Sequence, residues 1–292
     1  MFFASISGSA LATAAVLGTI LIPAMVKHGY DTRFATAVVG SASPIGVIIP
    51  PSVTFIIYGS STNTSIKDLY MAGLPAGIIL GVVLAIVAYI MARRYGYVGE
   101  QKSFDIKEFW ASFKDAIWAL GTPIIMVGGV FGGLFTPTES AVIAVLYALV
   151  IGLFVYKELK LKDLIPIFFD SAKTTGGLMF IVANAALFAY VMTIENIPQT
   201  VVQSMLSITE NPILLLLIIN IILLAAGAIM ETIAIIIVMV PLFMPVVEMI
   251  GMDPVVFGVI VVVNTAIGMI TPPFGLTLLT ASSVAKIGME QT

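Results

Sequence analysis

Two long apolar stretches of this chain are each interrupted by a pair of consecutive prolines. The pairs are Pro50-Pro51 and Pro272-Pro273. Proline has no backbone N–H, so each pair leaves carbonyl oxygens of the preceding helical turn without their usual donor. At membrane depth such bare backbone is tolerated only where it faces other protein or a polar cavity. The sequence therefore predicts two broken membrane helices whose interruptions face protein, an ion or a cavity.

Composition supports the membrane assignment. Hydrophobic residues make up 60% of the chain and charged residues 10%, whereas soluble domains carry about 25% charged residues. The absence of cysteine excludes disulfides, thiolate metal sites and cysteine nucleophiles. With one histidine and no HExxH, GxSxG or P-loop motif, the chain is not expected to be an enzyme or to bind a cofactor. The net charge of −3 gives no indication of nucleic-acid binding.

Hydropathy predicts an all-α polytopic membrane protein, because many segments reach the ~20 apolar residues that a spanning helix needs. Two further segments are polar and amphipathic, which is typical of helices lying at the membrane surface. In chain order the predicted segments are a broken helix at 33–59, a span at 69–92, an interfacial helix at 100–114, spans at 116–135 and 138–156, an amphipathic run at 159–173, a span at 174–194 and a second broken helix at 255–283.

The basic residues set the expected orientation. In this topology 12 of the 13 lysines and arginines fall on one face, which the positive-inside rule assigns to the cytoplasm. The scheme requires residues 1–27 and 212–250 each to return to the side from which they entered. We therefore expect two re-entrant hairpins, with tips near Ser7-Gly8-Ser9 and between Gly227 and Thr232.

The two halves also align with each other. A shift of 222 positions superimposes both Pro-Pro pairs and gives 13 identities over residues 8–67 and 230–289. Four predicted crossings lie between the copies, so the repeat is expected to be inverted, as in many secondary transporters. We accordingly expect two transport halves, at 1–66 and 212–292, separated by scaffold spans and interfacial arm helices at 67–211.

The helix breaks and hairpin tips are the candidate functional sites. The prolines free the carbonyls of two residues in each half, and nearby hydroxyls add further oxygen atoms, which suit a hard cation such as sodium. Structural kinks satisfied locally by serine or threonine are the alternative interpretation. The candidate sodium ligands are Ser7, Ser9, Ser43, Gly46 and Val47 in the first half, and Gly227, Thr232, Asn264, Gly268, Met269 and Thr271 in the second. The candidate substrate or coupling residues are Ser52, Glu231, Pro50, Pro51, Pro272 and Pro273.

Two carboxylates have competing interpretations. Glu231 lies in apolar surroundings, where a carboxylate is costly and usually functional. It could bind a cation, carry a proton or orient the tip, and alternatively it could cap the helix that follows. Glu139 lies in a tight turn and is interpreted as an N-terminal helix cap.

The same segments resemble the large membrane (M) subunit of tripartite ATP-independent periplasmic (TRAP) transporters. The stretches SGSALATAAVLGTILIPAMVKHGYDTRFA and GVIIPPSVTFIIYG are similar to that family's first hairpin and first broken helix. In the second half the similar stretches are GGLFTPTESA, AGAIMET and NTAIGMITPPFGLTLL. The resemblance covers nearly the whole chain.

This resemblance implies an elevator-type transporter in the bacterial inner membrane, with sodium at both tip-and-break pairs. It implies an organic-acid substrate, such as a C4-dicarboxylate, sialic acid or a sugar or keto acid. Its implied partners are a small membrane (Q) subunit and a periplasmic substrate-binding (P) protein, besides the lipid bilayer. It also implies helices before the first hairpin and after the second broken helix, so the chain is expected to be a fragment. A single-component sodium- or proton-coupled carboxylate transporter and a non-transporting membrane scaffold remain alternatives.

Overall fold

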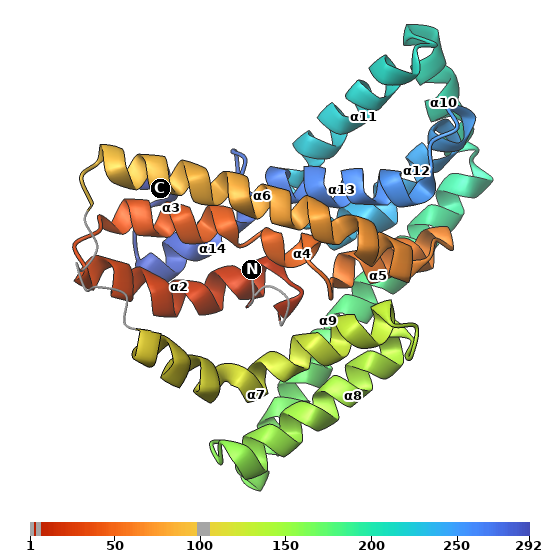
Figure 1. Ribbon diagram of the computed structural model, residues 1–292. Coiled ribbons are helices and arrows are strands. Elements are labelled where there is room, and N and C mark those ends of the chain that lie inside the picture. Colours follow the sequence, from red (N-terminus) through yellow and green to blue (C-terminus); the bar gives the residue numbers. More distant parts are fainter. Residues whose placement is uncertain (1–2, 4–6, 98–105) are drawn as a thin grey trace. The chain divides into compact units, whose positions relative to one another are not determined.

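The computed structural model describes residue 3, residues 7–97 and residues 106–292, and this part of the chain is helical without strands (Figure 1). Within these described residues, seven helical segments are long and apolar enough to cross a membrane, which confirms an all-α polytopic membrane protein. The α-helices are α2 (Ala10–Lys27), α3 (Thr32–Ala42), α4 (Ile45–Ile48), α5 (Val53–Thr62), α6 (Ile66–Arg94), α7 (Ile106–Phe131), α8 (Pro137–Val150), α9 (Leu161–Ile194), α10 (Ile197–Ile208), α11 (Pro212–Gly227), α12 (Thr232–Met249), α13 (Pro254–Gly268) and α14 (Leu276–Ala285).

Both predicted helix breaks are present. The first lies between α4 and α5, at residues 49–52, and the second lies between α13 and α14, at residues 269–275. Both Pro-Pro peptide bonds are cis. Helix α5 restarts because the Ser52 side chain accepts a hydrogen bond from the Phe55 N–H, and α14 restarts after Gly275 in a left-handed conformation, which glycine adopts at little cost.

Turns lie at both predicted tip positions. Helices α11 and α12 are joined by residues 228–231. Helix α2 begins directly after Ser9, which caps it, and Gly8 supplies the left-handed residue of the turn. The expected first arm of hairpin 1 falls mostly on residues 1–6, of which the structure describes only residue 3.

The 222-residue register is reproduced by the helix boundaries. Helix α2 spans residues 10–27 and α12 spans residues 232–249, so the register maps one onto the other at both ends. Asp31 and Asp253 are equivalent and each caps the following helix by accepting a hydrogen bond from a backbone N–H. Gly29 and Gly251 are also equivalent, and both have positive φ. The two copies therefore share local structure as well as sequence.

The two copies exchange their last helices. Helix α14, which follows the second break, packs against α2 and α3 of the first copy, while its equivalent α5 packs against α12 and α13 of the second (Figure 1). The approach of α14 is close, since a Cβ atom on Gly40 of α3 would lie 2.7 Å from Leu278 Cδ2. On the other side, the Tyr58 hydroxyl of α5 donates to the Pro254 carbonyl at 2.7 Å.

Two predicted interfacial helices are not separate elements, which corrects the sequence analysis. Residues 106–114 continue without interruption into the following span as α7, and residues 161–173 do the same as α9. Residues 107–120 contain no proline or glycine, so nothing stops α7 at the first junction. At the second junction α9 continues through Gly176-Gly177. The rest of the predicted 100–114 segment lies among residues 98–105, outside the described residues. The polar segment 195–211 contains the additional helix α10.

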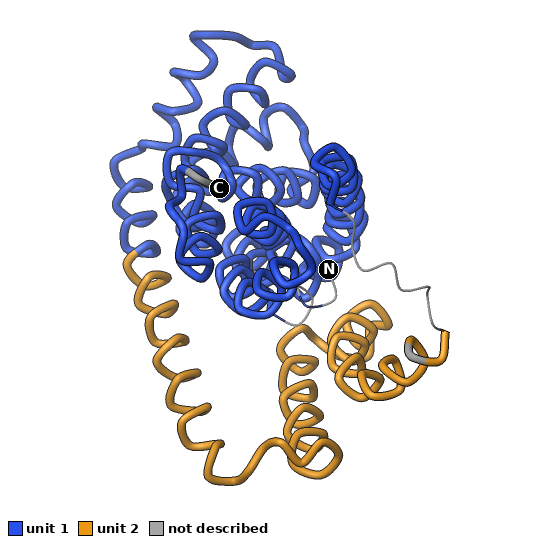
Figure 2. Tube along the Cα trace, turned by 90° about the vertical axis from the view of Figure 1, so that its left-hand side faces the viewer, with its two compact units in different colours: residues 1–100, 185–292 blue, residues 101–184 orange. Residues whose placement is uncertain are grey.

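The chain divides into two compact units (Figure 2). Residues 1–100 and 185–292 form the first, which contains both breaks and both tips, and residues 101–184 form the second. Helix α9 runs from one unit into the other. The predicted division into transport halves at 1–66 and 212–292 and scaffold at 67–211 concerns function rather than compactness, and it stays a prediction.

The exchange of helices predicts a specific stability effect. Replacing Tyr58 with Phe removes the hydroxyl that joins α5 to α13 and leaves the Pro254 carbonyl without this donor. We expect the free energy of unfolding to fall by about 1 kcal/mol, measured by thermal or denaturant unfolding in detergent. The control is Tyr190→Phe, at a tyrosine that is 64% exposed, and this variant should change stability by less than about 0.5 kcal/mol. Equal effects of the two substitutions would contradict the interpretation.

Candidate functional site

In the first half, the hairpin tip lies directly against the helix break. A Cβ atom on Gly46 would lie 2.9 Å from Thr13 Oγ1 and 3.2 Å from the Ser9 carbonyl oxygen. A Cβ atom on Gly8 would lie 3.0 Å from the carbonyl oxygen of Pro51. The tip therefore contacts the chain on both sides of the first break, and only glycine permits these approaches without displacement of neighbouring atoms.

The second half repeats this contact between two glycines. A Cβ atom on Gly268 would lie 2.6 Å from Gly227 Cα, and one on Gly227 would lie 3.1 Å from the Thr265 carbonyl oxygen. Thr232 adds a side-chain contact, since its hydroxyl lies 3.3 Å from Met269 Sδ. The structure thus brings tip and break together in both halves, as the sequence analysis expects.

One of the two freed carbonyls in each half is already satisfied. The Val47 carbonyl accepts hydrogen bonds from the hydroxyls of Ser52 at 2.5 Å and Thr54 at 2.8 Å. Its equivalent, the Met269 carbonyl, accepts from the Thr277 hydroxyl at 3.0 Å and the Thr277 N–H at 3.2 Å. A carbonyl oxygen has two lone pairs, so neither Val47 nor Met269 has one left for an ion in this conformation. Their role here is to join the two pieces of each broken helix.

The other freed carbonyls are more open. Pro50 has no N–H to donate to the Gly46 carbonyl. The neighbouring Ile49 N–H donates to the Ile45 carbonyl instead, at 2.9 Å. The Gly268 carbonyl accepts one bond, from the Thr271 N–H at 2.8 Å, which leaves one lone pair. The Thr271 hydroxyl points back along the chain to the Ile267 carbonyl. Among the predicted carbonyl ligands, Gly46 and Gly268 therefore have the capacity to bind a cation.

A pair of equivalent hydroxyls lies three residues before Gly46 and Gly268 in the chain. Ser43 donates to the Val39 carbonyl at 2.6 Å, and Thr265, 222 positions later, donates to the Val261 carbonyl at 2.8 Å. Both residues are fully buried. Because each hydroxyl proton is engaged, the oxygen presents lone pairs rather than a proton to any neighbouring cation. Thr265 is absent from the predicted ligand set, although the repeat register from Ser43 points to it.

Asn264 flanks the second break, as the sequence predicts, and joins two helices there. Its amide nitrogen donates to the carbonyl and to the side-chain oxygen of Asn220, at 3.0 and 2.7 Å, and so joins α13 to α11. Its own side-chain oxygen is buried and has no hydrogen-bond partner within the described structure. The tip, in contrast, contacts Thr265 and Gly268. Asn264 therefore stands beside the second break rather than at its contact with the tip.

Glu231 caps a helix, which is the alternative that the sequence left open. Its carboxylate accepts a hydrogen bond from the Ile233 N–H at 2.9 Å at the start of α12. It occupies the position equivalent to Ser9, which caps α2. Glu139 is the third residue of a capping box rather than the cap itself: Thr136 is the cap, and the Glu139 carboxylate accepts the Thr136 N–H.

The first hairpin tip also carries hydroxyls. Ser7 donates to the Ser9 carbonyl at 3.2 Å, and Thr13 donates to the same oxygen at 2.7 Å. The Ser9 hydroxyl accepts the Ala12 N–H at 3.4 Å, a long contact. Thr13 is also the side chain that lies nearest to Gly46, since its Oγ1 would be 2.9 Å from a Cβ atom at that position.

The buried polar chemistry of the chain is almost entirely that of hydroxyl groups. Apart from two tyrosines, the fully buried polar side chains that the structure describes are serines and threonines. No group of three or more His, Cys, Asp or Glu residues that could hold a metal occurs among the described residues. Neutral oxygen ligands of this kind suit a hard, weakly held cation and not a transition metal. The residues are Thr13, Thr36, Ser43, Ser52, Thr54, Ser140, Thr232, Thr265, Thr277 and Ser282.

The two breaks differ in how they are covered. Pro50, Pro51 and Ser52 are buried, and the Tyr70 hydroxyl of α6 donates to the Ser52 carbonyl at 3.4 Å. In the second half, Pro272 and Pro273 are exposed, and the Phe274 side chain is 51% exposed. The second break is therefore the one that presents proline and aromatic surface outward.

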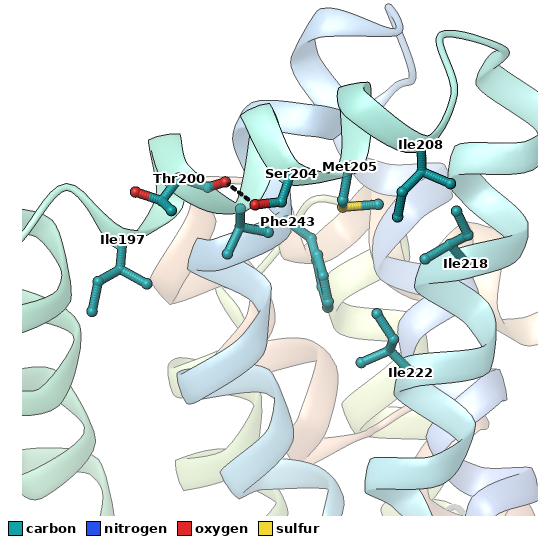
Figure 3. Close-up of a pocket in the computed structure, with 9 residues that line it drawn as sticks. Ile197, Thr200, Ser204, Met205, Ile208, Ile218, Ile222 and Phe243 are labelled. Carbon is teal, nitrogen blue, oxygen red and sulfur yellow. Dashed lines mark hydrogen bonds between the residues drawn. The ribbon is translucent and has the colours of Figure 1, made fainter.

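A separate pocket beneath α10 is a packing feature (Figure 3). It has a volume of about 300 Å³ and is lined mainly by apolar side chains of α10, α11 and α12, including Met205 and Phe243. Its two hydroxyls are already engaged, because Ser204 donates to the Thr200 carbonyl and Thr200 donates to the Asn196 carbonyl. None of the residues that line it belongs to either break.

Comparison with known proteins agrees with this architecture. Residues 1–292 match the family model described as the tripartite ATP-independent periplasmic transporter, DctM component. The chain belongs to this family. This confirms the resemblance drawn from the sequence, and a transporter component agrees with the expectation that the chain is not an enzyme.

Curated relatives whose names give different substrates are about equally similar to the chain in sequence. It is 43% identical to the isethionate TRAP transporter permease protein DctMQ of Oleidesulfovibrio alaskensis, over 100% of the chain and 46% of that protein. It is 41% identical to the C4-dicarboxylate TRAP transporter large permease protein DctM of Pseudomonas aeruginosa, over 100% of the chain and 68% of the relative. It is 38% identical to the sialic acid TRAP transporter large permease protein SiaM of Vibrio cholerae, over 98% of the chain and 67% of the relative. The chain thus spans about half to two-thirds of the length of these relatives.

The glycine contact at the second break predicts a strong substitution effect. In Gly268→Ala the new methyl group would lie 2.6–2.7 Å from backbone atoms of Gly227, and backbone cannot move aside as a flexible side chain can. We expect a loss of about 1–3 kcal/mol in the free energy of unfolding. The control is Gly176→Ala on α9, where nothing lies within 4 Å of the added atom; alanine should be neutral there or stabilise by up to about 1 kcal/mol. A neutral Gly268→Ala variant would show that the tip does not rest on the break.

Proposed function

We propose that this chain is the transport part of a large TRAP membrane subunit, which couples sodium entry to the import of an organic acid. The observation that carries the proposal is that each hairpin tip touches its helix break through glycine backbone, in two equivalent copies. Such paired discontinuous helices are where secondary transporters bind substrate and coupling ions. Membership of the family supports the same assignment.

Sodium is the proposed coupling ion because of the oxygen atoms present. The Gly46 carbonyl and the Ser43 hydroxyl belong to the first break, and the Gly268 carbonyl and Thr265 hydroxyl hold the equivalent positions in the second. These are neutral oxygens, without a buried carboxylate among them. A site of this composition holds a monovalent cation without neutralising it, so the bound ion adds net positive charge to its surroundings.

That added charge bears on the substrate. An organic acid is an anion at neutral pH, and the described lysines and arginines are not buried in the fold. Two bound sodium ions would supply positive charge where side chains do not, so that binding of the ions and of the anion favour each other. Such reciprocal binding is the thermodynamic basis of symport.

Substrate and partners follow from the relatives. Their names specify isethionate, C4-dicarboxylate and sialic acid, which are all small organic anions, and we propose a substrate of this class. One relative carries the joint designation DctMQ. We propose that this chain works with a small membrane (Q) subunit and a periplasmic binding (P) protein in the bacterial inner membrane.

The fold is compatible with re-entrant hairpins and an elevator motion. Helix α11 has 16 residues and so is about 24 Å long, shorter than the ~30 Å hydrocarbon core. A helix of this length that turns back at residues 228–231 is too short to cross, which supports a tip inside the membrane. Because α5 and α14 are exchanged between the copies, we propose that both tips and both breaks move as one body.

Substitution of the two equivalent hydroxyl residues, in the complete transporter, tests the proposed ion sites. Removing a cation ligand with Ser43→Ala or Thr265→Val should raise the half-saturating sodium concentration for substrate uptake about tenfold, which corresponds to about 1.4 kcal/mol. The matched control is Thr36→Val, since Thr36 is also buried on α3 and donates to a carbonyl four residues back. An unchanged sodium dependence in both site variants, or an equal change in the control, would overturn the assignment.

Sodium should also stabilise the purified protein. An ion that binds the folded state and not the unfolded state adds about 2.7 kcal/mol at 100 times its dissociation constant. We expect a higher melting temperature in sodium chloride than in choline chloride at the same ionic strength, and a smaller difference for Ser43→Ala. Equal melting temperatures in the two salts, up to molar sodium, would count against a folded-state sodium site.

A further inference from the structure

A long apolar groove runs between α3 and α6, on a face that plays no part in the tip-and-break contacts. Its volume is about 420 Å³, and it is lined by small side chains at helical spacing, namely Ala37 and Ser41 on α3 and Gly81, Ala85 and Ala88 on α6. Small residues on both walls leave space for a slender apolar chain. Helix α6 is otherwise widely exposed, with Val83 and Ile90 about half exposed, as expected of a helix facing lipid.

An aromatic cluster closes one end of the groove. Phe34 lines that end, and its ring lies 6.0 Å from the Tyr30 ring and 5.2 Å from the Tyr97 ring. The Tyr30 and Tyr97 rings are 5.2 Å apart. These contacts hold the start of α3 beside the end of α6. Tyrosines and phenylalanine grouped in this way are typical of the membrane–water interface.

The same end carries a concentration of positive charge. The segments 27–34 and 93–97 contain Lys27, Arg33, Arg93 and Arg94, all of them exposed. Their single carboxylate is Asp31, which accepts a hydrogen bond from the Arg33 N–H as the cap of α3. Basic residues at the end of a groove between membrane helices favour an anionic head group. Charge therefore distinguishes this end of the groove from its apolar interior.

The length of the groove matches one leaflet of a bilayer. From Met91 at the charged end to Gly81, both of which line the groove, ten residues of α6 rise about 15 Å. This is half of the ~30 Å hydrocarbon core. At the inner end the groove reaches Ile45, which packs with Ile49 and Leu84 in a small apolar core. Ile49 is the residue before Pro50, so the groove ends beside the first helix break.

We propose that this groove binds one acyl chain of an anionic phospholipid, whose head group is held by Arg33, Arg93 and Arg94. The occupant is a lipid rather than another helix because the groove joins an apolar channel of leaflet depth to a cationic, aromatic interface. The acyl chain packs on Ile45 and Leu84 and so supports the first helix break from its outer side. The inference concerns a lipid site and does not depend on which substrate is transported.

Cross-linking tests the occupant directly. The chain has no cysteine, so Ala88→Cys can be labelled with benzophenone-maleimide in nanodiscs that contain phosphatidylglycerol and phosphatidylcholine at a ratio of about one to nine. After illumination, intact mass measures which lipid is attached. The control is Ile90→Cys, which is on the same helix but outside the groove and 56% exposed. We expect the Ala88→Cys adducts to be enriched in phosphatidylglycerol and the Ile90→Cys adducts to follow the bulk ratio.

Charge removal tests the head-group contact. In the Ala88→Cys background, Arg33→Gln and Arg94→Gln should each lower the phosphatidylglycerol enrichment about fivefold. Lys67→Gln removes the same charge at the opposite end of α6 and should leave the enrichment unchanged. Adducts to polypeptide instead of lipid, enrichment equal to that of the Ile90→Cys control, or enrichment that survives both arginine substitutions would each overturn the proposal.

Discussion

The missing N–H of four proline residues is the constraint on which the rest of this structure depends. Pro50-Pro51 and Pro272-Pro273 each interrupt a helix that would otherwise cross the fold unbroken. Unsatisfied backbone is costly in an apolar environment, so freed carbonyls are expected to find other donors. In the first copy the Val47 carbonyl takes two hydroxyls, and in the second the Met269 carbonyl takes one hydroxyl and one N–H. The two pieces of each broken helix are therefore joined by hydrogen bonds that span the interruption. The carbonyls of Gly46 in the first copy and Gly268 in the second keep a free lone pair.

Glycine makes the next step possible. The tips approach the breaks at Gly46 and between Gly227 and Gly268, at distances where a single added methyl group would collide with neighbouring atoms. These contacts bring tip and break together at one point in each copy. The exchange of α5 and α14 then ties the two points together. Both breaks and both tips therefore belong to one compact unit.

Much of the fold could be predicted from the sequence because it depends on local chemistry. The breaks follow from proline, the tips from glycine and capping residues, and the repeat register from identities that the helix boundaries of α2 and α12 reproduce. The errors are equally local. The sequence predicts an interfacial helix at 100–114 and an amphipathic run at 159–173, whereas the described parts of both continue into the following spans as α7 and α9. Glu231 has a function as a cap that its residue type alone left undecided.

The sequence by itself determined where the backbone must break, which residues are equivalent in the two copies, and to which family the chain belongs. Only the tertiary structure decided which oxygens remain open. It showed that Val47 and Met269 are already satisfied, that Asn264 pairs with Asn220, and that Thr265 rather than Asn264 meets the tip. The physical reason is that a freed carbonyl is a property of one residue, whereas its satisfaction depends on donors that only the packing of distant helices brings within reach.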